Sequence, residues 1–244
     1  MSDVNQPVAL VTGANKGLGF EISRQLAQKG IRVFMSARDP ERAAAAAKRL
    51  LAEGLTVEPL WLDLNNAASI SAAADTLRAT QGKLDILINN AGIVDERDGP
   101  PTVASTDAVR HIMETNFTGT LAVTQAMLPL LKQAPAARIV NLSSSLGSLT
   151  LNGDPGSTYY SARLMGYNAS KAALNMLTVQ LAQELRGTSV VINSVSPGYV
   201  KTDLNGHNGV MTVEEGAKLP VEYALLGENA VSGQFIEPAG LSPW

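Results

Sequence analysis

The chain has 244 residues, of which 45% are hydrophobic and 17% charged, a balance typical of a globular protein with a sizeable core. Its 19 basic and 22 acidic residues give a net charge of −3, so the composition does not predict a basic surface for nucleic acid. The absence of cysteine excludes disulfides, thiolate nucleophiles and cysteine metal ligands. The two histidines, His111 and His207, do not have a metal-binding spacing, and we expect no metal site.

The beginning of the chain does not resemble a targeting segment. Its first ten residues, MSDVNQPVAL, carry an acid and no basic residue, unlike a signal peptide. No apolar run approaches the roughly 18 residues needed to span a bilayer. We therefore expect a cytoplasmic protein without a membrane partner.

Short apolar runs alternate with helix-favouring segments along almost the whole chain. Seven runs are predicted strands: 8–12, 31–36, 55–62, 84–88, 137–143, 189–195 and 233–237. Six segments are predicted helices: 18–29, 41–53, 67–80, 105–132, 158–186 and 213–226. Because parallel strands need crossovers long enough to hold a helix, the alternation predicts an α/β fold. We expect a single-domain, Rossmann-type, doubly wound parallel sheet of about seven strands with helices on both faces.

A glycine-rich segment, TGANKGLG at 12–19, follows the first predicted strand and places Gly13, Gly17 and Gly19 where the strand turns into a helix. Glycines there let the backbone approach a pyrophosphate, and the N–H groups at the helix start attract its negative charge. A plain tight turn would use similar residues, and the GxxxGxG spacing differs from the GxGxxG fingerprint. The position after the first strand of a parallel sheet nevertheless favours dinucleotide binding.

The end of the second predicted strand indicates which dinucleotide is bound. An acid there binds the ribose 2′-hydroxyl of NAD, whereas a basic residue binds the 2′-phosphate of NADP. Arg38 follows this strand, and Lys16 in the glycine-rich segment offers a second cation, so NADP (NADPH) is favoured over NAD. Each cation could instead be a solvated surface charge. Asp39 would oppose the argument unless it caps the next helix ahead of Pro40, as its position predicts.

Seven motifs occur in a characteristic order: TGANKGLG at 12–19, LDL at 62–64, NNAG at 89–92, TNFTG at 115–119, RIVNLSS at 138–144, YNASK at 167–171 and SPGYVKTDL at 196–204. Together they resemble the short-chain dehydrogenase/reductase family over nearly the whole chain. TGANKG, SARD, EEGA and GQF are most similar to the NADPH-dependent carbonyl reductases. The resemblance implies that residues 1–244 form one NAD(P)-binding domain of this family.

The catalytic residues that the resemblance implies are Asn116, Ser144, Tyr167 and Lys171. Tyr167 would be the general acid/base, Lys171 would lower its pKa and bind the nicotinamide ribose, and Ser144 would donate to the substrate oxygen. Asn116 would hold a water of a proton relay, although alone it could simply satisfy backbone groups. The four-residue spacing of tyrosine and lysine puts both on one helix face, but it also arises by chance. A tyrosine pKa near 10 must fall by roughly three units for work near neutrality, and a nearby ammonium shifts it in that direction.

The resemblance also implies the cofactor contacts. Asp63 would accept from the adenine amino group, NNAG would border the adenosine ribose, and SPGYVKTDL would bind the carboxamide and the pyrophosphate. The predicted cofactor-binding residues are Gly13, Asn15, Lys16, Gly17, Leu18, Gly19, Arg38, Asp63, Leu64, Asn90, Ala91, Gly92, Tyr167, Lys171, Pro197, Gly198, Val200 and Thr202.

The chain departs from the family pattern between Ser144 and Tyr167, whose separation of 23 residues is longer than in most members. The additional segment 149–166 is rich in turn formers and is predicted to be a loop beside the active-site mouth. The resemblance implies a homodimer or homotetramer. Because the segment could obstruct the helix packing that forms tetramers, a monomer stays open.

These features predict an NADP-dependent short-chain dehydrogenase/reductase that reduces a ketone or aldehyde to an alcohol, with a small-molecule carbonyl or alcohol as its partner. Three alternatives remain: a reductase of carrier-bound 3-oxoacyl groups, an NAD-dependent secondary alcohol dehydrogenase, and a non-enzymatic NADP-binding redox sensor. Sensors of this kind typically lose the tyrosine or the lysine, whereas this chain retains both.

Overall fold

The structure, a computed structural model, describes residues 6–244 and is built around one eight-stranded sheet. The strands are β1 Val8–Val11, β2 Arg32–Ala37, β3 Val57–Trp61, β4 Ile86–Asn89, β5 Ala137–Leu142, β6 Val190–Val195, β7 Phe235–Glu237 and β8 Gly240–Leu241. Their order is β3-β2-β1-β4-β5-β6-β7-β8, and every neighbouring pair is parallel except β7 with β8. This confirms the predicted doubly wound parallel sheet.

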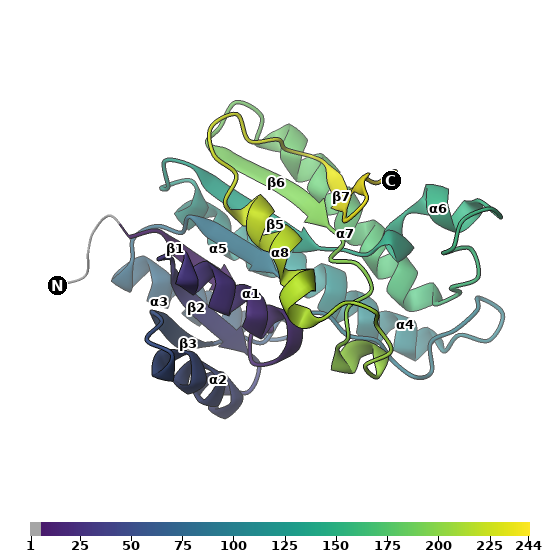
Figure 1. Cartoon of the computed structure of the whole chain (residues 1–244), viewed down its shortest axis with the longest axis horizontal. Coiled ribbons are helices and arrows are strands. Elements are labelled where there is room, and N and C mark those ends of the chain that lie inside the picture. Colours follow the sequence, from purple (N-terminus) through teal and green to yellow (C-terminus); the bar gives the residue numbers. More distant parts are fainter. Residues whose placement is uncertain (1–5) are drawn as a thin grey trace.

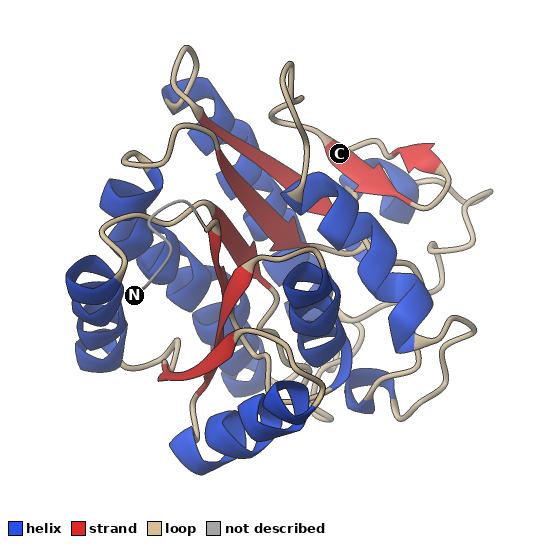
Figure 2. Cartoon of the chain, turned by 60° about the vertical axis from the view of Figure 1, so that its left-hand side comes forward, coloured by secondary structure: helices blue, strands red, loops and turns tan. Residues whose placement is uncertain are grey.

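Helices cover both faces of the sheet (Figures 1 and 2). They are α1 Gly17–Gln28, α2 Pro40–Ala52, α3 Ala67–Thr80, α4 Thr106–Met113, α5 Thr120–Leu131, α6 Leu149–Gly153, α7 Met165–Glu184 and α8 Val213–Ala224. A π-helical segment, Glu114–Gly119, joins α4 to α5, and short 3-10 turns occupy Ser145–Gly147 and Asp203–Asn205. The helices α1, α2 and α8 share one hydrophobic core with the sheet, and α3, α5 and α7 share the other.

The strands bury side chains on both faces, which is why their sequences are continuous apolar runs. In β1, for example, Val8 and Leu10 belong to the core under α3 and α5, whereas Ala9 and Val11 belong to the core under α1. All four are at most 3% exposed. A strand that faced water on one side would alternate with polar residues instead.

The seven predicted strands all exist, and four of the six predicted helices lie close to their expected bounds. The predicted helix 105–132 is interrupted by the π-helical segment, and the predicted helix start at 158 is wrong, because α7 begins at Met165. Residues before it form turns, and the segment 149–166, predicted to be a loop, contains the one-turn helix α6. The two-residue strand β8 was not predicted.

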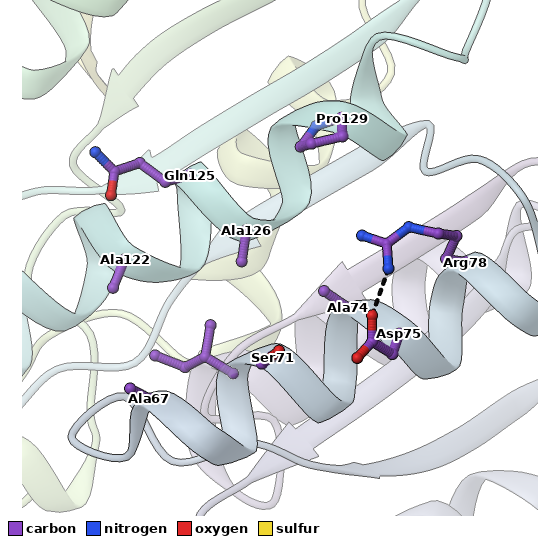
Figure 3. A pocket seen from close by; sticks show the side chains of 10 residues that line it. Ala67, Ser71, Ala74, Asp75, Arg78, Ala122, Gln125, Ala126 and Pro129 are labelled. Carbon is purple, nitrogen blue, oxygen red and sulfur yellow. Dashed lines mark hydrogen bonds and ion pairs between the residues drawn. The ribbon is translucent and has the colours of Figure 1, made fainter.

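Two further features of the described residues complete the fold. No helix within residues 6–244 has the length and apolar character that a bilayer crossing requires. A surface hollow of about 410 Å³ lies between α3 and α5, and its lining includes four alanines and the ion pair of Asp75 with Arg78 (Figure 3). It contains none of the predicted site residues.

Candidate active site

The predicted motifs meet at the carboxyl edge of the sheet. Because the strands are parallel, the loops after β1 to β6 all leave from this edge. The chain order reverses between β1 and β4, and in doubly wound sheets ligands bind at such a switch point. The glycine-rich turn leaves β1 and NNAG leaves β4, so both motifs border the switch point.

The glycine-rich turn requires glycine for two measurable reasons. Gly13 and Gly17 adopt positive φ angles of +63° and +55°. A methyl group at Gly19 would lie 2.4 Å from Asn90 Nδ2 and 2.6 Å from the Gly13 carbonyl oxygen. Lys16, which precedes α1, makes no side-chain capping bond, and the first turn of α1 carries no acid. This uncapped, acid-free helix start fits a pyrophosphate, whose charge the helix dipole and N–H groups stabilise.

The NNAG segment braces this turn. Asn90 Nδ2 donates to the carbonyl oxygens of Thr12 at 2.8 Å and Gly13 at 3.2 Å. The Thr12 hydroxyl accepts from the backbone N–H groups of Asn90 and Ala91, both at 3.0 Å. Asn89 instead lies within the sheet, where its Nδ2 donates to Asn141 Oδ1 at 2.8 Å. The bracing roles of Thr12 and Asn90 were not predicted, because only the fold places these loops side by side.

The two predicted cations flank the glycine-rich turn, and neither is buried. Arg38 is exposed and its guanidinium makes no hydrogen bond or ion pair within residues 6–244. Lys16 forms an ion pair with Asp203, whose side chain is also exposed. Asp39 caps α2 as predicted: its Oδ1 accepts from the N–H groups of Glu41 at 3.0 Å and Arg42 at 3.2 Å. Asp39 is thus engaged with its helix. The cations beside the turn that fit a 2′-phosphate are the Arg38 guanidinium and the Lys16 ammonium, which is paired with Asp203.

The loop after β6 closes over the glycine-rich turn. A methyl group at Gly17 would contact Thr202 Cγ2 at 4.0 Å, and the Lys16–Asp203 pair joins the same two segments. Gly198 has a φ of +87°, and Val200 is buried against Gly216. The other predicted cofactor residues also lie at this edge of the sheet. Leu18 is in the first turn of α1, and the rest are in the loops that follow β1, β3, β4 and β6: Asn15, Asp63, Leu64, Ala91, Gly92 and Pro197.

Tyr167 and Lys171 lie in the first two turns of α7, and both side chains are buried, with exposures of 9% and 4%. Lys171 Nζ donates to the Leu142 carbonyl oxygen at 2.7 Å and lies 5.6 Å from the centre of the Tyr167 ring. A methyl group at Gly92 would lie 3.5 Å from both Lys171 Nζ and Asn116 Oδ1. Helix α7, β5, the loop after β4 and the π-helical segment therefore converge on one point.

Burial controls the ionisation of this pair. It raises the pKa of Tyr167 to about 12, while the Ser144 hydroxyl acts in the opposite direction. It also lowers the pKa of Lys171 from 10.5 to about 8. We expected a net lowering of the tyrosine pKa, and the net shift is in the opposite direction because desolvation of the phenolate outweighs the Ser144 hydrogen bond.

Ser144 follows β5 and its side chain is oriented by its own turn. Its Oγ accepts from the Leu146 N–H at 3.2 Å, so its hydroxyl proton can be donated toward the Tyr167 phenol. Its two neighbours are engaged elsewhere: Ser143 donates to Asn175 Oδ1 at 2.6 Å and Ser145 to Glu237 Oε2 at 2.5 Å. Of the three adjacent serines, Ser144 is the one that interacts with Tyr167.

Asn116 lies in the π-helical segment and is 1% exposed. Its Oδ1 accepts from the Ile93 N–H at 2.8 Å, and its Nδ2 donates to the Ile93 carbonyl oxygen and to Ser170 Oγ, both at 3.0 Å. The side chain thus ties the loop after β4 to α7. Ser170 was not predicted, although its place in YNASK beside Lys171 was a usable signal. Single π-turns inside helices are frequent at functional sites.

The comparisons with known proteins agree with this geometry. The model of the short chain dehydrogenase family matches residues 7–211, and the chain belongs to this family. Carbonyl reductase [NADPH] 1 of Mus musculus is 36% identical, covering 98% of this chain and 99% of the relative. (-)-Isopiperitenone reductase of Mentha piperita is 33% identical over 94% and 96% of the two chains. The NADPH-bound carbonyl reductase from chicken fatty liver superposes with a TM-score of 0.84 at 31% identity, over 98% and 99% of the chains.

Proposed function

We propose that the chain is an NADPH-dependent reductase that converts a ketone or aldehyde to an alcohol, with residues 1–244 acting as one domain. The observation that carries this proposal is the convergence of Tyr167, Lys171 and Asn116 beside the glycine-rich turn. The names of the relatives in Mus musculus and chicken, both NADPH carbonyl reductases, support the same cofactor and substrate class.

The turn after β1 and the first turn of α1 would hold the pyrophosphate, and Lys16 and Arg38 would bind the 2′-phosphate. The loop after β6 would cover the nicotinamide end. When bound, NADPH would supply a hydride to the carbonyl carbon. Reduction to the alcohol also needs one proton on the carbonyl oxygen. The chain's own residues supply that proton.

Tyr167 donates the proton. Its raised pKa of about 12 keeps the phenol protonated at neutral pH, which is the form a general acid needs. Ser144 donates a hydrogen bond from its hydroxyl to the same substrate oxygen as negative charge develops there. The Lys171 ammonium stabilises the phenolate that remains, and Asn116, whose Oδ1 lies beside Gly92 together with Lys171 Nζ, would hold the water through which a proton returns. In the oxidation direction Tyr167 would act as the base.

The test compares initial rates with NADPH and NADH against a panel of activated ketones, aldehydes and diketones. We expect turnover that favours NADPH at least tenfold and falls by at least a hundredfold in Tyr167→Phe, in line with the loss of a general acid. Tyr223→Phe, a half-buried tyrosine on α8, is the matched control and should retain full activity. Equal rates for Tyr167→Phe and the parent would support the redox-sensor alternative instead. A preference for NADH would contradict the roles of Lys16 and Arg38.

A further inference from the structure

The start of helix α7 depends on a carboxylate from a distant part of the chain. The residue before the helix, Leu164, makes no side-chain capping bond, and the first turn contains no acid. The first N–H groups of a helix have no partner within it, so those of Met165, Gly166 and Tyr167 need acceptors from elsewhere. Tyr167 thus lies in the turn that frays first when the cap is lost.

Asp98 and Gly99 supply all three acceptors. Asp98 Oδ1 accepts from the Gly166 N–H at 2.8 Å, and Asp98 Oδ2 accepts from the Tyr167 N–H at 2.9 Å. The carbonyl oxygen of Gly99 accepts from the Met165 N–H at 2.9 Å. The two donors that Asp98 satisfies are 68 and 69 residues away in sequence.

The packing around this contact leaves no room for a side chain at Gly166. A methyl group at Gly166 would lie 3.0 Å from Ile112 Cδ1, 3.1 Å from Val109 Cα and 3.3 Å from Asp98 Oδ2. Helix α4, which carries Ile112 and Val109, therefore approaches the backbone of α7 directly, and Asp98 enters at the same place. Gly99 is buried there, and Asp98 is half-buried.

The loop that carries Asp98 is itself held in place. The backbone N–H of Asp98 donates to the Asp95 carbonyl oxygen at 2.9 Å, and that of Ser105 donates to the Arg97 carbonyl oxygen at 3.0 Å. Asp95 also pairs with Arg97 at 2.7 Å and with His111 at 3.3 Å. The carboxylate of Asp98 is thus presented by an organised turn that begins at Asp95, three residues after Gly92.

We propose that Asp98 is a positioning residue for the reaction: it caps α7 across the chain and thereby holds the backbone of Tyr167, and so its phenol, at the substrate oxygen. Displacement of a catalytic group by about 1 Å can cost a hundredfold in rate. Asp98 forms no hydrogen bond or ion pair with Lys171 or Ser144, so its effect passes through the Tyr167 backbone. The expected effect on catalysis rests on the proposed function, whereas the capping of α7 by Asp98 does not.

The test uses Asp98→Ala and Asp98→Asn in the full chain, with Asn66→Ala as the matched control. Asn66 caps α3, where its side chain accepts from the Ser69 N–H, and that helix carries no candidate catalytic residue. Hydrogen exchange of the peptide spanning 165–171 is measured first, because it needs no substrate. We expect exchange at the start of α7 to accelerate at least tenfold in Asp98→Ala, less in Asp98→Asn, which keeps one acceptor oxygen, and not at all in Asn66→Ala.

Turnover is then measured at saturating NADPH, below the melting temperature of every variant. We expect kcat to fall ten- to a hundredfold in Asp98→Ala and less in Asp98→Asn, while KM for NADPH changes less than twofold and Asn66→Ala retains kcat. Unchanged exchange, or a loss of kcat no larger than in Asn66→Ala, would overturn the proposal; if Asp98→Ala does not fold, Asp98→Asn decides by the same criteria. A parent without reductase activity would contradict the proposed function, and the exchange result would still decide whether Asp98 holds Tyr167.

Discussion

At the scale of single residues, the site combines a tyrosine that keeps its proton with a lysine that loses its proton easily. Both shifts have one cause, since each charged form is unfavourable when buried. The pair therefore suits proton donation at neutral pH. Ser144 and Asn116 complete the arrangement, and backbone groups hold both side chains in place. The Leu146 N–H donates to the Ser144 hydroxyl, and the Ile93 N–H donates to Asn116 Oδ1.

The lowered pKa of Lys171 predicts a pH dependence. We expect kcat for reduction to be constant below about pH 8 and to fall, approaching tenfold per unit, as the pH rises beyond it. Above that pH Lys171 loses the charge that stabilises the tyrosine phenolate, whereas Tyr167 keeps its proton up to about 12. The measurement is kcat from pH 6 to 10, with recovery of activity at pH 7 as the control for unfolding. A rate that stays constant to pH 10 would contradict the requirement for the ammonium.

At the scale of elements, the interruption between α4 and α5 matters most for the site. The sequence predicted one continuous helix there, because the whole segment 105–132 is helix-favouring. The π-turn at Glu114–Gly119 instead lets Asn116 reach both Ile93 and Ser170. Near its end, a methyl group at Gly119 would lie 2.6 Å from the Leu64 carbonyl oxygen, so this segment also packs tightly against the loop after β3.

Helix α2 offers a test of its cap. We expect Asp39→Ala to lower the free energy of unfolding by about 1 kcal/mol, because two backbone N–H groups lose their acceptor, and Asp39→Ser to retain most of it. Urea denaturation measures the difference. Asp39→Ala should also leave the ratio of the NADH rate to the NADPH rate at least as high as in the parent chain. A selective loss of NADH turnover would mean that Asp39 binds a ribose rather than the helix.

At the scale of the whole molecule, the binding energy of the cofactor adds to the stability of the fold. Both sides of the switch point contribute to the candidate site, so a ligand there bridges the loops after β1, β4 and β6. A ligand that binds only the folded state at a hundred times its Kd stabilises it by about 2.7 kcal/mol. Thermal unfolding therefore reports on cofactor choice without any substrate.

We expect NADPH to raise the melting temperature more than NADH at equal concentration, and the advantage to shrink with added salt because Lys16 and Arg38 are exposed. The Lys16→Ala, Arg38→Ala double variant should respond equally to both cofactors. Lys29→Ala, an exposed lysine at the other end of α1, is the matched control and should keep the difference. Equal shifts with the unmodified chain would contradict a 2′-phosphate site.

Local patterns in the sequence were sufficient to predict the sheet, its parallel strands, the glycine turn and the Asp39 cap. Each depends on residues near one another in the chain: apolar runs buried on both faces, glycines with positive φ, or a carboxylate within reach of the next N–H groups. The start of α7 at Met165, the π-turn and the bracing of Gly13 by Asn90 depend on contacts between distant segments. Only the tertiary structure decides these, because the partners meet when the sheet forms, and burial at the same point sets the ionisation of Tyr167 and Lys171.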